Sequence, residues 1–115
     1  METTIYHNPR CSKSRETLAL LIAHGISPRV VDYQKIALDR ATLKSILTAL
    51  GTPAHAIVRK SEPVFLAEVL DQATEEGLLD ALVRFPILLE RPIVVAGTRA
   101  AIGRPPANVL ALFER

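Results

Sequence analysis

The order of secondary-structure signals in the first 33 residues constrains the fold more than any other feature of this chain. Residues 3–7 are rich in β-branched and aromatic side chains, which predicts a short strand that Asn8 and Pro9 end. A stretch with apolar residues at helical spacing follows and is closed by Gly25, and residues 29–33 predict a second strand. A strand, a helix and a strand in this order favour two parallel strands joined by a right-handed crossover.

The middle of the chain predicts helices instead of strands. Asp39 is a candidate N-cap for a helix that Gly51 ends, and Thr74 is a candidate N-cap for another helix that Pro86 limits. We therefore expect a helical insertion at approximately residues 36–88.

The C-terminal part returns to strands. Residues 93–96 form a continuous apolar run typical of a buried strand, residues 97–99 predict a turn, and residues 100–102 predict a weak strand. Pro106 suits the first position of a last helix. One parallel pair and one hairpin can share a four-stranded mixed sheet. We therefore expect an α/β fold of the thioredoxin-like kind with flanking helices, in a single domain over residues 1–115.

Composition argues against several classes of protein. The net charge is +2, the basic residues are scattered and aromatic residues make up 4% of the chain, which is unlike a nucleic-acid-binding surface. No apolar run approaches the roughly 18 residues of a membrane span, and we expect no signal peptide. A single cysteine cannot form an internal disulfide, which fits a reducing compartment. We expect a cytoplasmic monomer that binds neither nucleic acid nor membranes.

The only cysteine, Cys11, lies at the predicted start of the first helix. Backbone N–H groups at a helix N-terminus carry a partial positive charge, and Arg10, Lys13 and Arg15 add full charges nearby, with His7 as a further candidate. Such settings lower a thiol pKa from about 8.5 into the range ~3.5–7.5. The same N–H groups can cradle a tetrahedral anion. Cys11 is therefore predicted to be a nucleophile that attacks a small oxyanion; the alternative is a small buried apolar residue.

The spacing around Cys11 excludes two kinds of chemistry. The sixth residue after it is Thr17, whereas a tyrosine phosphatase loop needs an arginine there. Ser14 stands where a dithiol motif has its second cysteine, so disulfide chemistry requires an outside thiol, such as glutathione or a glutaredoxin. His24 and His55 have no cysteine or acidic partner at ligand spacing, and we expect no metal site.

Residues 5–15 resemble the active-site segment of the glutaredoxin-dependent arsenate reductase (ArsC) family. Three further segments match in the same order, at residues 58–60, 90–95 and 102–106, so that the resemblance covers essentially the whole chain. The resemblance implies a thioredoxin-like fold with a helical insertion and a cysteine thiolate that attacks arsenate. It also implies that glutathione, as a cosubstrate, and glutaredoxin deliver the electrons, with no bound cofactor, and that arsenite leaves in a reaction of arsenic detoxification.

The resemblance also implies roles for individual residues. Arg59, Arg91 and Arg104 match three arginines that bind the oxyanion, and Pro92 matches a proline that follows a cis peptide bond. Taken without the resemblance, each arginine can equally be a solvated turn residue. Three converging guanidinium groups suit arsenate, because each can hold two oxygens and stabilise the charge that develops on them during attack.

Four residues near Cys11 are candidate supporting residues: His7, Asn8, Ser14 and Arg15. His7 either tunes the thiolate or simply ends the strand. Ser14 and Arg15 either hydrogen-bond the thiolate or belong to the first helical turn as ordinary polar residues.

Two other functions stay open. Arsenate reductases of this family often have Gly-Thr where this chain has Ser12 and Lys13, so the thiol chemistry is better defined than the oxyanion. The first alternative is a glutathione-linked oxidoreductase of monothiol-glutaredoxin type that acts on another substrate. The second is a non-enzymatic transcription regulator, since thioredoxin-like relatives bind RNA polymerase; those regulators usually keep a Cys-x-x-Cys switch, which is missing here.

Overall fold

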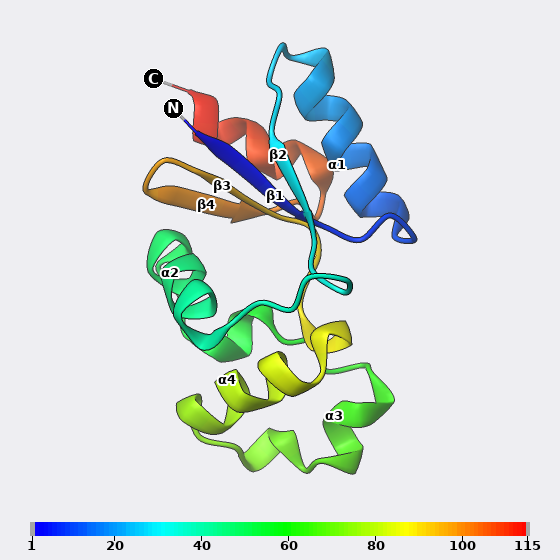
Figure 1. The fold of residues 1–115 in the computed structure, drawn as a ribbon, viewed down its shortest axis with the longest axis vertical. Coiled ribbons are helices and arrows are strands. Elements are labelled where there is room, and N and C mark those ends of the chain that lie inside the picture. Colours follow the sequence, from blue (N-terminus) through cyan, green and yellow to red (C-terminus); the bar gives the residue numbers. More distant parts are fainter. Residues whose placement is uncertain (1, 115) are drawn as a thin grey trace. The chain divides into compact units, whose positions relative to one another are not determined.

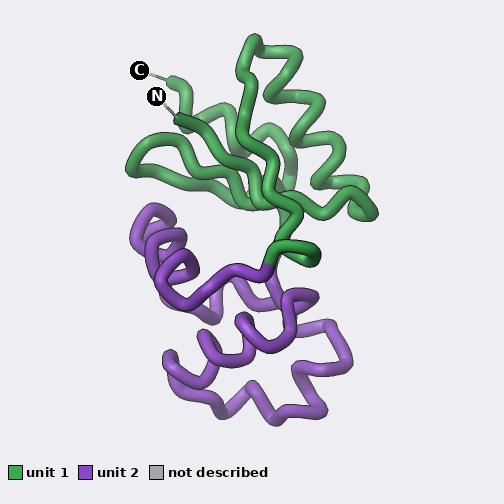
Figure 2. The backbone as a smooth tube through the Cα atoms, viewed as in Figure 1, with its two compact units in different colours: residues 1–36, 91–115 green, residues 37–90 purple. Residues whose placement is uncertain are grey.

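The computed structural model describes residues 2–114. The chain divides into two compact units, one made of residues 1–36 and 91–115 and the other of residues 37–90 (Figure 2). The first unit contains Cys11 and the sheet, and the second unit is helical. The expectation of one domain over the whole chain stays a prediction.

A four-stranded mixed sheet with the strand order β2-β1-β3-β4 forms the first unit (Figure 1). β1 (Thr3–His7) pairs in parallel with β2 (Arg29–Asp32). β3 (Ile93–Ala96) is antiparallel to β1 and to β4 (Arg99–Ile102). The predicted α/β fold, with a parallel pair and a hairpin in one sheet, is thus confirmed.

Helices of the first unit close over the sheet through apolar contacts. α1 (Ser12–Ala23) begins directly after Cys11, as the sequence predicts, and Gly25 follows it with a φ of +77° that favours glycine. The last helix, η4 (Pro106–Phe113), begins at Pro106 as predicted but is a 3-10 helix that packs against α1 and β4. The shared core is made of Ile5, Leu21, Val94, Ala96, Val109 and Leu112.

The start of β4 differs from the sequence-based expectation. Arg99, which was expected in a turn, is the first residue of β4 and pairs with Ala96, because Gly97 and Thr98 alone form the hairpin loop. Gly97 has a φ of +62°, which is what such two-residue loops need. The Arg99 guanidinium donates to the carbonyls of the last turn of η4, at 3.1 Å to Ala111 and 2.6 Å to Leu112.

Residues 37–90 form a separate group of short helices. α2 (Arg40–Leu50) packs against α4 (Glu75–Arg84), and both helices have the N-caps that the sequence predicts. The Asp39 carboxylate accepts from the Thr42 N–H at 2.8 Å, and the Thr74 hydroxyl accepts from the Gly77 N–H at 3.1 Å. The remaining helices are η1 (Ala54–Ile57), α3 (Pro63–Ala67), η2 (Leu70–Gln72) and η3 (Pro86–Leu88).

Helix α3 is absent from the sequence-based prediction. It has five residues, Pro63 opens it, and Phe65 is its one buried side chain. A helix this short shows too little apolar periodicity to be recognised, and it exists because Phe65 packs into the interior of this unit. Among all helices in residues 2–114, none is long and apolar enough to cross a membrane.

Gly103 marks a close approach between α1 and the loop after β4. A Cβ atom at this position would lie 2.5 Å from the Thr17 Oγ1 and 2.8 Å from the Pro92 Cγ. The Gly103 N–H donates to the Pro92 carbonyl at 2.9 Å, so the backbone cannot move away without losing that bond. Only glycine fits between these groups.

We expect the substitution Gly103→Ala to lower the free energy of unfolding by about 1–3 kcal/mol, because the added methyl overpacks a buried contact. Urea denaturation measures this loss. Thr17→Ala in the same chain removes two of the three close atoms and should recover part of it. A Gly103→Ala variant as stable as the wild type would contradict the close approach.

Candidate active site

The strand register brings four chain segments to one edge of the sheet in the first unit. β1 and β2 are parallel and end side by side, because His7 and Asp32 are register partners. Tyr6 pairs with Ile93 at the start of β3, and Ile93 pairs with Ile102 at the end of β4. The segments after β1, β2 and β4 and the segment before β3 therefore meet at this edge. These segments carry Cys11, Tyr33, Arg104 and Arg91, which we call the Cys11 site.

A tight loop places the cysteine at the N-terminus of α1. The Cys11 N–H donates to the Asn8 carbonyl at 3.0 Å, and the Asn8 side-chain oxygen accepts from the Arg10 N–H at 3.0 Å. Cys11 is the N-cap residue, with extended backbone angles, and its side chain is partly exposed. The sulfur is therefore reachable from solvent and faces the first N–H groups of the helix.

The surroundings of Cys11 favour its thiolate form. Burial alone would raise the pKa of this thiol, but hydrogen bonds from the Ser14 N–H, the Arg91 side chain and the Lys13 N–H outweigh it. The charge of Arg104 acts in the same direction, and its Nη2 donates to the sulfur at 3.4 Å. The net effect is a Cys11 pKa below its usual value, which makes the sulfur a better nucleophile at neutral pH.

Arg91 and Arg104 are linked to each other as well as to the sulfur. The Arg104 Nε donates to the Arg91 carbonyl at 2.8 Å. The peptide bond from Arg91 to Pro92 is cis, as the resemblance implies, and the bond from Arg104 to Pro105 is cis as well. The structure thus gathers two of the three predicted arginines at Cys11.

The Arg91 guanidinium has buried N–H groups that no acceptor meets. Its Nε and Nη1 lack a hydrogen-bond partner within residues 2–114. A buried polar group without a partner costs about 1–3 kcal/mol, so this arrangement is unusual in the absence of a role. Burial alone would lower the pKa of Arg91. The hydrogen bond to the Cys11 sulfur and the electrostatic interaction with Tyr33 outweigh burial and hold this pKa above the usual value. Arg91 is cationic throughout the physiological range.

Tyr33 belongs to the site although the sequence analysis places it only at the end of a strand. β2 ends one residue earlier, because the Asp32 carbonyl accepts from the N–H groups of Lys35 and Ile36 and turns the chain. Tyr33 is 1% exposed, and its hydroxyl has no hydrogen-bond partner in the described part of the chain. The signal that identifies it is its position after a parallel strand, opposite Asn8.

His7 and Ser14 support the loop from within. The His7 Nδ1 lies 2.6 Å from the Ser14 Oγ, which also accepts from the Asn8 N–H at 3.0 Å. Burial, aided by the charge of Arg15 and opposed by Asp32, lowers the pKa of His7, so its imidazole is neutral at pH 7. His7 therefore ends β1 and adds no positive charge at neutral pH, contrary to one expectation from the sequence.

Arg15 and Arg59 each have a partner within their own unit. The Arg15 Nη1 donates to the Pro9 carbonyl at 2.9 Å, so it holds the loop. Arg59 lies in the second unit, where its Nε pairs with the Glu62 carboxylate at 3.2 Å and both side chains are largely buried. The convergence of Arg59 on the sulfur stays a prediction. Among residues 2–114, no cluster of three or more His, Cys, Asp and Glu side chains could hold a metal ion.

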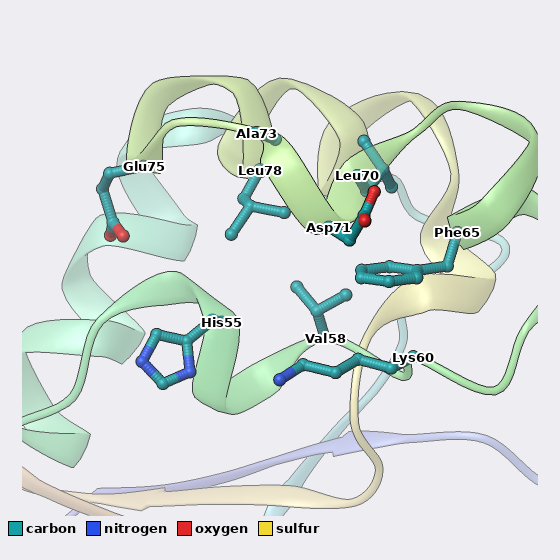
Figure 3. A pocket seen from close by; sticks show the side chains of 9 residues that line it. All are labelled: His55, Val58, Lys60, Phe65, Leu70, Asp71, Ala73, Glu75 and Leu78. Atoms are coloured by element: carbon teal, nitrogen blue, oxygen red, sulfur yellow. The ribbon is translucent and has the colours of Figure 1, made fainter.

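The second unit has a pocket of its own, with a volume of about 370 Å³ (Figure 3). Apolar side chains form most of its wall, and charged or polar groups stand at its margin, including His55, Lys60 and Glu75. The Glu75 carboxylate accepts from the Ala54 N–H at 3.0 and 3.1 Å, so it caps η1. No cysteine, serine or threonine lines the pocket.

Known proteins are similar to this chain in sequence, and a solved structure is similar to it in fold. The ArsC family model matches residues 6–112. The uncharacterized protein YfgD of Escherichia coli is 48% identical over 112 residues, which cover 95% of this chain and 94% of that protein. An arsenate reductase of Neisseria meningitidis is 42% identical over 115 residues, 97% of this chain and 98% of the relative. The structure of an arsenate reductase from Vibrio cholerae matches with a TM-score of 0.93 at 42% identity, covering 96% of this chain and 97% of that one.

The fold and the site define an α/β protein of thioredoxin-like structure with one activated cysteine at a helix N-terminus. The family match covers most of the chain and includes every residue of the Cys11 site. The chain belongs to the ArsC family, and relatives similar to it over nearly their full length are named arsenate reductases.

We expect the Cys11 thiol to react with iodoacetamide at a lower pH than the about 8.5 typical of a free cysteine. Arg91→Met should move the midpoint of the alkylation rate to higher pH, because it removes a hydrogen bond and a charge that favour the thiolate. Mass spectrometry of the alkylated protein over a pH series measures both midpoints. Arg15→Met is the matched control, because it also removes one positive charge, from a side chain that donates to the Pro9 carbonyl. Equal midpoints in the wild type and Arg91→Met would contradict this account of the site.

Proposed function

We propose that this protein is an arsenate reductase that uses Cys11 as its nucleophile and takes electrons from glutathione and glutaredoxin. The observation that carries the proposal is the hydrogen bonding of one accessible sulfur by both Arg91 and Arg104 at a helix N-terminus. Nucleophile and anion-binding groups coincide there, as attack on an oxyanion requires. The names of the similar relatives support arsenate as the oxyanion.

The first step joins sulfur to arsenic. The Cys11 thiolate attacks the arsenic atom of arsenate, an S–As bond forms, and one oxygen leaves as water after taking up the proton that the thiol released. Arsenic stays in the +5 state in this step. Arg91 and Arg104 hold the oxygens and balance the charge that shifts onto them, and the N–H groups of α1 add their partial charge. Arg59 is the third arginine in this role.

The second step transfers two electrons. The thiolate of glutathione attacks the Cys11 sulfur, an S–S bond forms, and the electron pair of the S–As bond stays on arsenic, which leaves as arsenite in the +3 state. Because the chain has one cysteine, the resulting mixed disulfide has no internal thiol to resolve it. A glutaredoxin thiol then takes the glutathione and restores Cys11, so the reaction fits a monomeric protein in the reducing cytoplasm.

A second candidate function shares the thiol chemistry. YfgD, which is 48% identical to this chain, is named an uncharacterized protein. Similarity to it therefore does not indicate which oxidised substrate Cys11 reduces. In this case Cys11 reduces a glutathione mixed disulfide, as a monothiol glutaredoxin does. The two arginines at the sulfur favour the oxyanion, since a neutral disulfide gains less from them.

Purified protein with glutathione, glutaredoxin, glutathione reductase and NADPH should reduce arsenate, because the site supplies the nucleophile and the anion-binding groups. NADPH oxidation that depends on arsenate, together with detection of arsenite, measures turnover. Cys11→Ser should show no turnover above the reaction without protein. Wild-type protein that matches this variant would contradict arsenate reduction, and activity on a glutathione mixed disulfide in that preparation would favour the second candidate.

Arg59→Met should weaken arsenate binding by about 10-fold or more, because a charge-assisted hydrogen bond contributes about 1.5–3 kcal/mol. The KM for arsenate in the coupled assay measures this, and the pH dependence of Cys11 alkylation should stay unchanged. Lys60→Met, at the adjacent position, is the control for loss of a positive charge. An unchanged KM in Arg59→Met would remove Arg59 from the oxyanion site.

A further inference from the structure

We propose that Tyr33 is a further oxyanion-binding residue of the Cys11 site, whose hydroxyl donates a hydrogen bond to an oxygen that Arg91 also binds. The inference rests on the proposed function, because it assigns one more group to the same oxyanion. Tyr33 lies outside the cysteine segment and is none of the three arginines. Its hydroxyl is buried without a hydrogen-bond partner in the described residues.

The sheet places Tyr33 and Arg91 on the two sides of the strand that leads to Cys11. β1 lies between β2 and β3 in the sheet (Figure 1). Tyr33 follows the last residue of β2, and Arg91 stands two residues before β3. The Arg91 charge acts on Tyr33. The polar side chains of Arg91, Asn8 and Gln34 also lie close enough to its hydroxyl to influence it. Tyr33 therefore flanks the guanidinium that binds the sulfur.

The buried groups of the Cys11 site that lack partners are rich in donors. The Arg91 Nε carries one N–H and its Nη1 carries two, and the Tyr33 hydroxyl adds an O–H. The phenolic oxygen is the one acceptor in this set. Such a set fits an oxygen with several lone pairs and a negative charge, and it does not fit a cation or an apolar ligand.

Two neighbouring acceptor oxygens each already accept a hydrogen bond from another donor. The Asn8 side-chain oxygen accepts from the Arg10 N–H, and the Arg91 carbonyl accepts from the Arg104 Nε. The Tyr33 hydroxyl does not add to the stability of the fold, because a phenylalanine would fill the same space without burying an unpartnered O–H. The burial of Tyr33 also keeps its hydroxyl protonated, and hence a donor, at neutral pH, because burial raises its pKa.

The substitution Tyr33→Phe tests the assignment without removing volume from the interior. Arsenate, phosphate and sulfate serve as probes, and each should slow alkylation of wild-type Cys11 by iodoacetamide when it occupies the site. In Tyr33→Phe, the anion concentration that halves the alkylation rate should rise about 10-fold, the factor expected for a hydrogen bond to a charged group. The alkylation rate without anion, and its pH midpoint, should stay the same.

Tyr6→Phe is the matched control, because it removes the same hydroxyl from the only other tyrosine of the chain, on β1. Protection in this variant should equal that in the wild type. Equal protection in Tyr33→Phe and the wild type would overturn the assignment of Tyr33 and leave the proposed function intact. A shift of the Cys11 pH midpoint with unchanged protection would also overturn it, since Tyr33 then acts through Arg91 alone. If no anion protects the wild-type thiol, the oxyanion site fails, and the assignment of Tyr33 fails with it.

Thermal unfolding supplies a readout that needs no reaction at the cysteine. Without anion, Tyr33→Phe should be at least as stable as the wild type, because it loses an unpartnered buried hydroxyl. With saturating phosphate or sulfate, the melting temperature of the wild type should rise by more than that of the variant, because a ligand stabilises the state that binds it better. A Tyr33→Phe variant that is less stable than the wild type without anion would show that the hydroxyl has a structural partner, and would overturn the proposal.

Discussion

The parallel pairing of β1 with β2 is the constraint on which the Cys11 site depends. Because the partners His7 and Asp32 end their strands together, the cysteine loop and Tyr33 emerge at the same sheet edge. In the antiparallel hairpin, β3 begins and β4 ends at this same edge. The segment before β3 and the segment after β4 therefore lie there too. Hydrogen bonds of the sheet thus bring together residues from four distant parts of the chain, and no side-chain contact has to hold them alone.

Two kinds of group lower the pKa of Cys11: backbone N–H groups of α1 and arginine side chains. The N–H groups of Ser14 and Lys13 belong to the first turn of α1 and cannot be lost while the helix exists. Arg91 and Arg104 contribute through side chains. His7 is neutral and buried, and it acts through the Ser14 hydroxyl that orders the loop. The thiolate is therefore favoured mainly by the backbone and two guanidinium groups, without help from an imidazolium.

The sequence was informative wherever the signal is local. The N-caps Asp39 and Thr74, and the helix start after Cys11, follow from residue type and spacing within one helical turn, and all three are confirmed. Resemblance to the ArsC family added Arg91 and Arg104, which no local pattern separates from ordinary turn residues. Tyr33 and α3 could not be found in this way. The place of Tyr33 depends on strand pairing, and α3 depends on the packing of a single phenylalanine.

The contact between Gly103 and Thr17 has a consequence for how such sequences can change. It joins the helix that begins at Cys11 to the segment that continues into Arg104, and a hydrogen bond to Pro92 fixes its spacing. The nucleophile and one of its anion-binding groups therefore belong to segments that have no spare room where Gly103 meets Thr17. A residue larger than glycine at position 103 would clash with Pro92 as well as with Thr17. Position 103 should accordingly remain glycine among homologues, for a reason of packing and not of chemistry at the sulfur.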